Sequence, residues 1–223
     1  MTLRKGATLE IVDCWGGDLT RTLSRVSMTH LPGLSSPIFM EYQLSPRSLR
    51  LLGPGGSFSY INTDDIHPLV GEEFPLLPLA TIRELRLKYR GSWVPPEFRL
   101  SSFPSLEILV VDGHDVGDCF TNGGGSIPNT PAVPSLSSVS PNPASPPSLK
   151  TLAFLDCVIT EDFMVKLARV ALDRKNYASN SLRRVVIMNS KGRFPSAGSI
   201  ERLRKYVPAI EVLEGKEFPK DLL

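Results

Sequence analysis

The chain has 223 residues, with 25 Lys and Arg against 23 Asp and Glu, and 41% of its residues are hydrophobic. This composition is typical of a globular chain with a real core. The near balance of charge argues against a dedicated nucleic-acid binder, because such proteins carry a strong basic excess. Three cysteines are too few for a disulfide framework, and no apolar run approaches the roughly 18 residues of a membrane helix. Secreted, membrane and disulfide-stapled classes are therefore excluded, and we expect a cytoplasmic or nuclear protein.

The first third of the chain carries only short and irregular signals. Residues 9–12 and 48–52 each have the pattern of a short strand, and the Gly/Pro-rich residues 53–56 have that of a turn. Terminal units of a repeat protein are usually atypical, because they must cover the open end of its core. We therefore expect residues 1–80 to form irregular repeats or a cap, within a single domain that spans residues 1–223.

A repeated pattern begins at Ile82 and returns three times. Aligned on their first apolar residue, the four copies carry apolar residues at offsets 0, +3 and +5. These residues are Ile82, Leu85, Leu87; Leu106, Leu109, Val111; Leu149, Leu152, Phe154; and Leu182, Val185, Ile187. Offsets +3 and +5 lie two apart, so they point to the same side of a strand, and that side must be buried. We expect four neighbouring strands with these side chains inward, and a last strand at residues 210–213.

The second interval of the repeat holds an insertion. Successive copies begin 24, 43 and 33 residues apart. No charged residue lies between Asp118 and Lys150, and residues 126–148 contain seven Pro and seven Ser. This composition favours a flexible Gly/Ser/Pro-rich insertion outside the core, which we place at residues 120–148. Prolines at every third position from Pro128 also fit a ligand for a proline-binding domain, but a linker explains them more simply.

The last third of the chain predicts two helices. Thr160 is a good N-cap for the first, and the two acidic residues after it suit the positive end of the helix dipole. An apolar stripe follows at helical spacing: Phe163, Leu167, Val170 and Ala171. A second helix over residues 199–206 would place Ile200 and Leu203 inward and its basic side chains outward.

The copy that starts at Leu149 follows the leucine-rich-repeat template L-x-x-L-x-L-x-x-N/C-x-L, with Cys157 at the N/C position. Together with the helix after it, this copy resembles the cysteine-containing leucine-rich repeats that lie C-terminal to F-boxes in fungal F-box-like proteins. The resemblance implies an α/β fold: a short, irregular leucine-rich-repeat-like solenoid with a mainly parallel, curved sheet, in which Cys157 is a buried turn residue. No convincing F-box precedes the repeats, because residues 41–54 lack the helical pattern that an F-box needs.

No arrangement of residues indicates an enzyme. The chain has no G-x-S-x-G motif, and the glycines at 53–56 are not followed by the Lys of a phosphate-binding loop. Residues 112–119 offer carboxylates, an imidazole and a thiol as metal ligands, but a polar turn after a strand explains them too. No second ligand pair stands at zinc spacing. We therefore expect no catalytic activity, no cofactor and no metal.

One face of the expected sheet is the candidate binding surface, because solenoids present such a face to their partners. Between the buried anchors, the strands carry an apolar ladder beside a basic end. The candidate partner-binding residues are Arg83, Arg86, Lys88, Val110, Asp112, Leu155, Val186 and Met188. An exposed apolar ladder marks a protein interface, although an N-terminal segment that folds over it would account for it equally well.

These observations predict a protein–protein interaction module. The family resemblance adds a more specific expectation, substrate recognition for a ubiquitin-ligase adaptor, with ligase subunits or substrates as partners. The alternative function is a regulatory module for an anionic or nucleic-acid partner, bound by late basic residues: Arg183, Arg184, Lys191, Arg193, Arg202, Arg204 and Lys205. We prefer a solvated face for this cluster, because no aromatic side chains for base stacking are interleaved with it.

Overall fold

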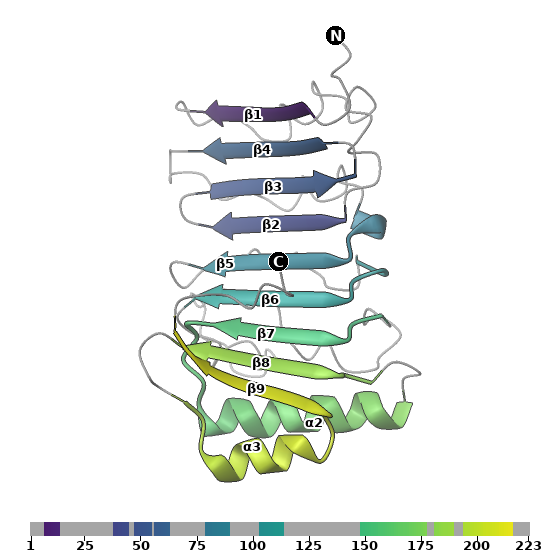
Figure 1. Ribbon diagram of the computed structural model, residues 1–223, viewed down its shortest axis with the longest axis vertical. Coiled ribbons are helices and arrows are strands. Elements are labelled where there is room, and N and C mark those ends of the chain that lie inside the picture. Colours follow the sequence, from purple (N-terminus) through teal and green to yellow (C-terminus); the bar gives the residue numbers. More distant parts are fainter. Residues whose placement is uncertain are drawn as a thin grey trace, which may run out of the picture.

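The computed structural model describes residues 7–13, 38–44, 47–54, 56–62, 79–89, 103–113, 148–177, 181–189 and 194–215. These residues form a nine-stranded sheet with two α-helices, and the strand order is β1-β4-β3-β2-β5-β6-β7-β8-β9. Figure 1 shows the strands as a ladder from β1 at one edge to β9 at the other, with both helices at the β9 end. All neighbouring strands are parallel except β2 with β3 and β3 with β4. The expected α/β class and mainly parallel sheet are therefore confirmed.

The parallel half of the sheet contains the four sequence repeats. Its strands are β5 (Glu84–Tyr89), β6 (Ile108–Gly113), β7 (Thr151–Leu155), β8 (Arg184–Asn189) and β9 (Ala209–Glu214). Every anchor predicted at offsets 0, +3 and +5 is at most 5% exposed. Leu85 lies opposite Leu109, and Leu152 lies opposite Val185. The predicted inward register is therefore confirmed, and so is the strand expected at residues 210–213.

A repeated pair of backbone hydrogen bonds joins neighbouring strands at the point where each strand starts. The carbonyl of Arg83 accepts the N–H groups of Glu107 and Ile108 at 2.8 and 3.0 Å. Ile38, Glu107 and Lys150 act as double acceptors in the same way, each toward the next strand. These bonds hold the register through the main chain, independently of the size of the side chains.

The other half of the sheet consists of three antiparallel strands and one edge strand: β2 (Phe39–Leu44), β3 (Arg47–Gly53), β4 (Gly56–Asn62) and β1 (Ala7–Asp13). Gly53 lies opposite Gly56, so only two residues connect β3 to β4, as the Gly/Pro-rich turn predicted. The strands expected at residues 9–12 and 48–52 are confirmed. The strands β2 and β4 were not predicted, because neither carries the repeat.

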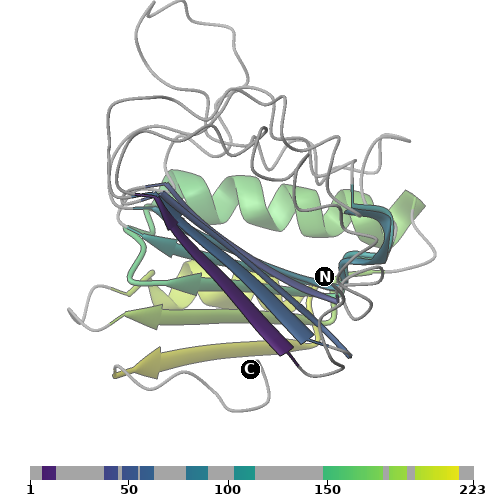
Figure 2. The same cartoon turned by 90° about the horizontal axis from the view of Figure 1, so that it is seen from above.

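The first helix, α2 (Glu161–Tyr177), packs its predicted apolar stripe into the core. Seen from above, α2 lies along one face of the sheet, whose strands rotate progressively from β1 to β9 (Figure 2). The ring of Phe163 meets Phe154 of β7 edge-on, with 5.1 Å between the ring centroids. The Thr160 hydroxyl accepts the N–H of Phe163, which confirms the predicted N-cap. Among the described residues, neither helix is long and apolar enough to cross a bilayer.

The second helix, α3 (Ala197–Arg204), begins two residues earlier than expected because Ser196 caps it. Glu161 links the two helices: its carboxylate accepts hydrogen bonds from the hydroxyl of Ser199 and from the backbone N–H of Ser196. These bonds, that of Ser199 first, lower the pKa of Glu161. One carboxylate at the N-terminus of α2 therefore also holds the N-terminus of α3, where a negative charge is favourable.

Cys157 occupies the turn between β7 and α2 and is 1% exposed. Its thiol lies 3.2 Å from the carbonyl oxygen of Leu155 and 3.4 Å from that of Val111, and donates to them. Its own carbonyl accepts the side-chain amide of Asn189 at 3.2 Å. The prediction of a buried turn residue at position 157 is confirmed, and this residue connects three strands.

Substitutions of Cys157 test this position. We expect Cys157→Arg to lower the free energy of unfolding by about 3–5 kcal/mol, because it buries a charge without a partner. Cys157→Asn should cost much less, because its amide supplies two N–H donors for the same two carbonyls. Urea unfolding followed by circular dichroism measures both effects. Equal and small losses would contradict the role of position 157 in the turn.

Candidate functional site

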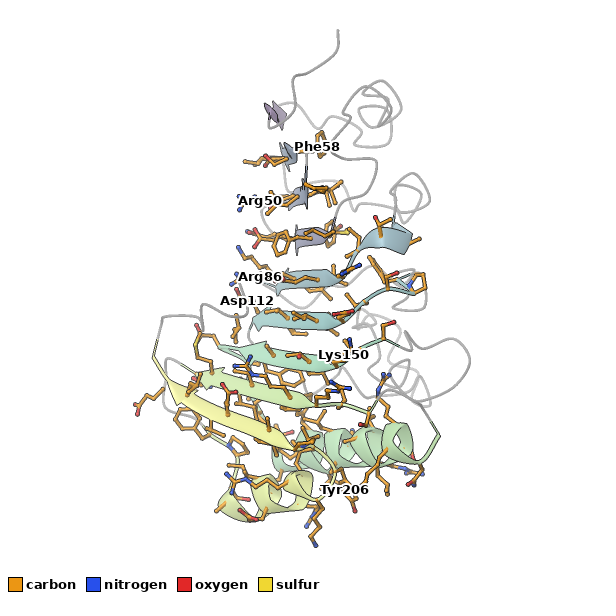
Figure 3. The ribbon with its side chains drawn as sticks, turned by 45° about the vertical axis from the view of Figure 1, so that its right-hand side comes forward. Arg50, Phe58, Arg86, Asp112, Lys150 and Tyr206 are labelled. Atoms are coloured by element: carbon orange, nitrogen blue, oxygen red, sulfur yellow. The ribbon has the colours of Figure 1, made fainter. Side chains whose placement is uncertain are left out.

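The face of the sheet that carries the offset +4 and +6 residues is called here the outer face, and the face that carries the buried anchors the inner face. Figure 3 shows Arg50, Arg86 and Asp112 extending from one side of the sheet and Phe58 from the other. Phe58 belongs to the core of the inner face. The outer face divides into a shielded apolar part and an open charged part, and its functional potential lies in the second.

The apolar ladder on the outer face consists of Val110, Ala153, Leu155, Val186 and Met188, which form a hydrophobic cluster of their own. Each of these side chains is at most 5% exposed. The expected exposure of Val110, Leu155, Val186 and Met188 is therefore wrong, since the ladder is shielded from solvent. Burial under an N-terminal segment was the other alternative for these residues; much of the first 80 residues, at 1–6, 14–37 and 63–78, lies outside the described residues.

Of the basic end expected at Arg83, Arg86 and Lys88, the last two residues are neutralised by acidic side chains on both neighbouring strands. The ammonium of Lys88 lies 2.9 Å from the carboxylate of Glu41 on β2. The guanidinium of Arg86 donates to Asp112 on β6 at 3.0 Å and lies 3.7 Å from Glu41. We call Glu41, Arg86, Lys88 and Asp112 the charge ladder. The sequence predicted three of its members but not Glu41, with which two acidic side chains balance the two basic ones.

Beside the charge ladder, the outer face is hollowed into a groove of about 550 Å³, a volume typical of ligand sites. The groove lies where the starts of β2, β5 and β6 meet the end of β3. Its lining residues are Ile38, Phe39, Glu41, Arg50, Leu52, Gly53, Pro54, Arg83, Glu84, Arg86, Glu107, Ile108 and Val110. Ile38, directly before β2, is 50% exposed. The groove therefore offers open apolar surface with charged groups around it.

Glu84 stands among apolar neighbours inside the groove. In the register of the sheet it lies between Phe39 of β2 and Ile108 of β6. Partial burial raises the pKa of its carboxyl above the usual 4.5, and the nearby guanidinium of Arg86 offsets part of that rise. A ligand that brings a cation to Glu84 would be favoured, and one that brings a second anion there would be repelled.

Within the part of the chain that the structure describes, the two other candidate clusters from the sequence form no site. Among the described residues, no three His, Cys, Asp or Glu side chains lie close enough to hold a metal ion, and residues 114–119 are outside that part of the chain. Of the late basic residues, Arg184 forms a two-point ion pair with Glu211 on the outer face, with N–O distances of 2.7 and 2.8 Å. Three others lie exposed on or directly after α3: Arg202, Arg204 and Lys205. The described members of the basic cluster therefore lie in two separate places.

Sequence reasoning found part of the groove and missed the rest. Arg83, Arg86 and Val110 line it and were predicted, because they belong to the repeats. The residues from β2 and β3 were missed: Ile38, Phe39, Glu41, Arg50 and Leu52. The alternation of apolar and polar residues from Met40 to Gln43 was the available signal, because Met40 and Tyr42 are buried and Glu41 and Gln43 are less so.

Burial of the apolar ladder predicts how it responds to a charge. We expect Leu155→Glu to lower the free energy of unfolding by more than about 2 kcal/mol, because it places an unpaired charge in a shielded cluster. Val165→Glu is the matched control, since Val165 lies on α2 and is 45% exposed. Thermal unfolding compares the two variants. Equal stability of both would show that the ladder is accessible to solvent.

The raised pKa of Glu84 predicts a pH dependence of stability. The folded chain holds this proton more tightly than the unfolded chain, so the free energy of unfolding falls as the pH rises from 4.5 through the raised pKa. The side chain of Glu84→Gln cannot ionise, so its free energy of unfolding lacks this loss. The variant should therefore gain stability relative to the unsubstituted chain when the pH is raised from about 4 to about 7. Urea unfolding at both pH values measures this, and a difference that does not change with pH would contradict it.

Comparison with protein-family models, with curated proteins and with solved structures found no match. The charge ladder, the shielded apolar ladder and the open groove are the three features of the outer face that bear on function.

Proposed function

We propose that this protein is a recognition module that binds a segment of another protein in the groove on its outer face. The observation that carries the proposal is the groove itself, in which the exposed Ile38 and the half-buried Phe39 are surrounded by charged side chains. Protein interfaces combine an apolar centre with a polar rim in this way. The double backbone acceptors at Ile38 and Arg83 hold β2, β5 and β6 in register, so this part of the surface is ordered by the main chain.

The repeated strands support a more specific form of the proposal. Parallel strands with the anchors at offsets 0, +3 and +5, and a buried Cys157, are what a degenerate leucine-rich-repeat solenoid would have. The resemblance to fungal F-box-like proteins then suggests substrate recognition for a ubiquitin ligase. The strands β2 (residues 39–44) and β3 (residues 47–53) lie where an F-box would need helices. An adaptor role would therefore need an F-box from another segment or another chain.

A site-specific cross-linking experiment tests the proposal. A photoreactive benzoylphenylalanine replaces Ile38 in the groove, and in a second protein it replaces Val165 on α2, which is similarly exposed. We expect a partner protein to be cross-linked from position 38 and not from position 165. Recovery of ligase subunits or of their substrates would support the adaptor function, and mass spectrometry identifies them.

The double variant Ile38→Ser/Phe39→Ser provides the control in binding measurements with the identified partner. Its affinity should fall about tenfold or more, because apolar anchors at the centre of an interface each contribute more than about 1 kcal/mol. Val165→Ser should leave the affinity unchanged. Equal cross-linking from both positions would overturn the groove as the binding site. An affinity that is unchanged in the Ile38→Ser/Phe39→Ser variant would do the same.

A further inference from the structure

The basic side chains around the groove differ in whether they already form an ion pair with an acidic side chain. Arg86 and Lys88 belong to the charge ladder, and Lys150 pairs with Glu107 at 3.3 Å. Arg50 and Arg83 are exposed and form no ion pair within the described part of the chain. Two guanidinium groups at the rim therefore keep their hydrogen-bond donors available for a ligand.

The acids around the groove show the opposite distribution. Glu41 and Glu107 both face cations of their own, at 2.9 Å to Lys88 and 3.3 Å to Lys150. Glu84 lies toward the middle, half-buried between Phe39 and Ile108. A ligand carboxylate is therefore attracted to the two arginines at the rim and repelled from the middle, where apolar contact is available.

The positions of the two arginines set the length of a ligand. Arg50 lies on β3 and Arg83 at the start of β5, with β2 between these strands. Arg50 is level with Arg86 in the register of the sheet, and Arg83 lies three residues before Arg86. Two strand spacings of about 4.8 Å and three residues of about 3.3 Å along the strand place the two backbones about 14 Å apart. An extended peptide advances about 3.3 Å per residue, so about four residues cover that distance. The apolar side chains of Ile38, Phe39 and Leu52 line the same groove.

We propose that the groove binds an extended segment of a partner protein that carries two acidic side chains about four residues apart, with a large apolar side chain between them. Arg50 and Arg83 bind the two carboxylates through charge-assisted hydrogen bonds, and the apolar side chain packs on Phe39 and Leu52. This inference rests on the proposed function, since it names the chemistry of the segment that enters the groove.

A displayed library of random 12-residue peptides, selected on the immobilised full chain, tests the inference. We expect enrichment of peptides in which Asp or Glu flanks an aromatic or aliphatic residue. Selection on the Arg50→Glu/Arg83→Glu variant should enrich Lys and Arg at the flanking positions instead. Selection on Arg169→Glu, which changes an exposed arginine of α2, should give the same peptides as the unsubstituted chain.

A synthetic peptide from the selection provides the quantitative measurement by fluorescence anisotropy. Reversing either rim arginine should weaken binding about tenfold, as expected for the loss of a hydrogen bond to a charged group. Glu84→Gln should tighten binding about twofold to threefold, because it removes a repulsion. If a single-stranded oligonucleotide competes for the groove as strongly as the unlabelled peptide does, the groove is a nucleic-acid site and the inference is overturned.

The outcomes separate this inference from the proposed function. Enrichment of apolar peptides that depends on Ile38 and Phe39, but is insensitive to Arg50→Glu and Arg83→Glu, would overturn the acidic ligand and leave the groove as a protein-binding site. Peptides whose binding is unchanged in Ile38→Ser/Phe39→Ser would place recognition elsewhere and overturn both.

Discussion

The register between neighbouring strands is the constraint on which both faces of this molecule depend. A slip of one residue in any strand would move its inward anchors to the outer face and its charged residues into the core. Backbone carbonyls at Ile38, Arg83, Glu107 and Lys150 hold this register, because each accepts two N–H groups from the next strand. The apolar anchors then stack in continuous rows, and α2 covers them at the β9 end of the sheet.

The outer face follows from the same register. Toward β8, its rows are apolar and shielded from solvent, as Ala153 and Val186 show. Toward β2, the rows carry Glu41 and Arg86, which pair with each other and remain partly exposed. Val110 belongs to both parts, since it is fully buried and also lines the groove. The groove lies at this border, where apolar surface is available but the neighbouring strands carry charges.

The period of the sequence was sufficient to predict the parallel half of the fold. Residues two apart on a strand must share a side, so the spacing of the anchors from Ile82 onward was enough to assign them to the core. The N-cap at Thr160 and the turn at Cys157 were predictable for a similar reason. Each depends on residues that are close in the sequence or on a repeat that occurs several times.

The tertiary structure alone decided which strands became neighbours and which side chains met across them. Glu41 neutralises Lys88 from a strand that carries no repeat, and the groove forms because β2 and β3 lie beside β5. In the sequence, Arg174 is an ordinary basic residue near a helix end. In the folded chain it is buried and donates to the carbonyl of Leu149, and burial lowers the pKa of its guanidinium. A local pattern determines which side of a strand is apolar, whereas the partners of its other side are distant residues that only the folded chain brings together.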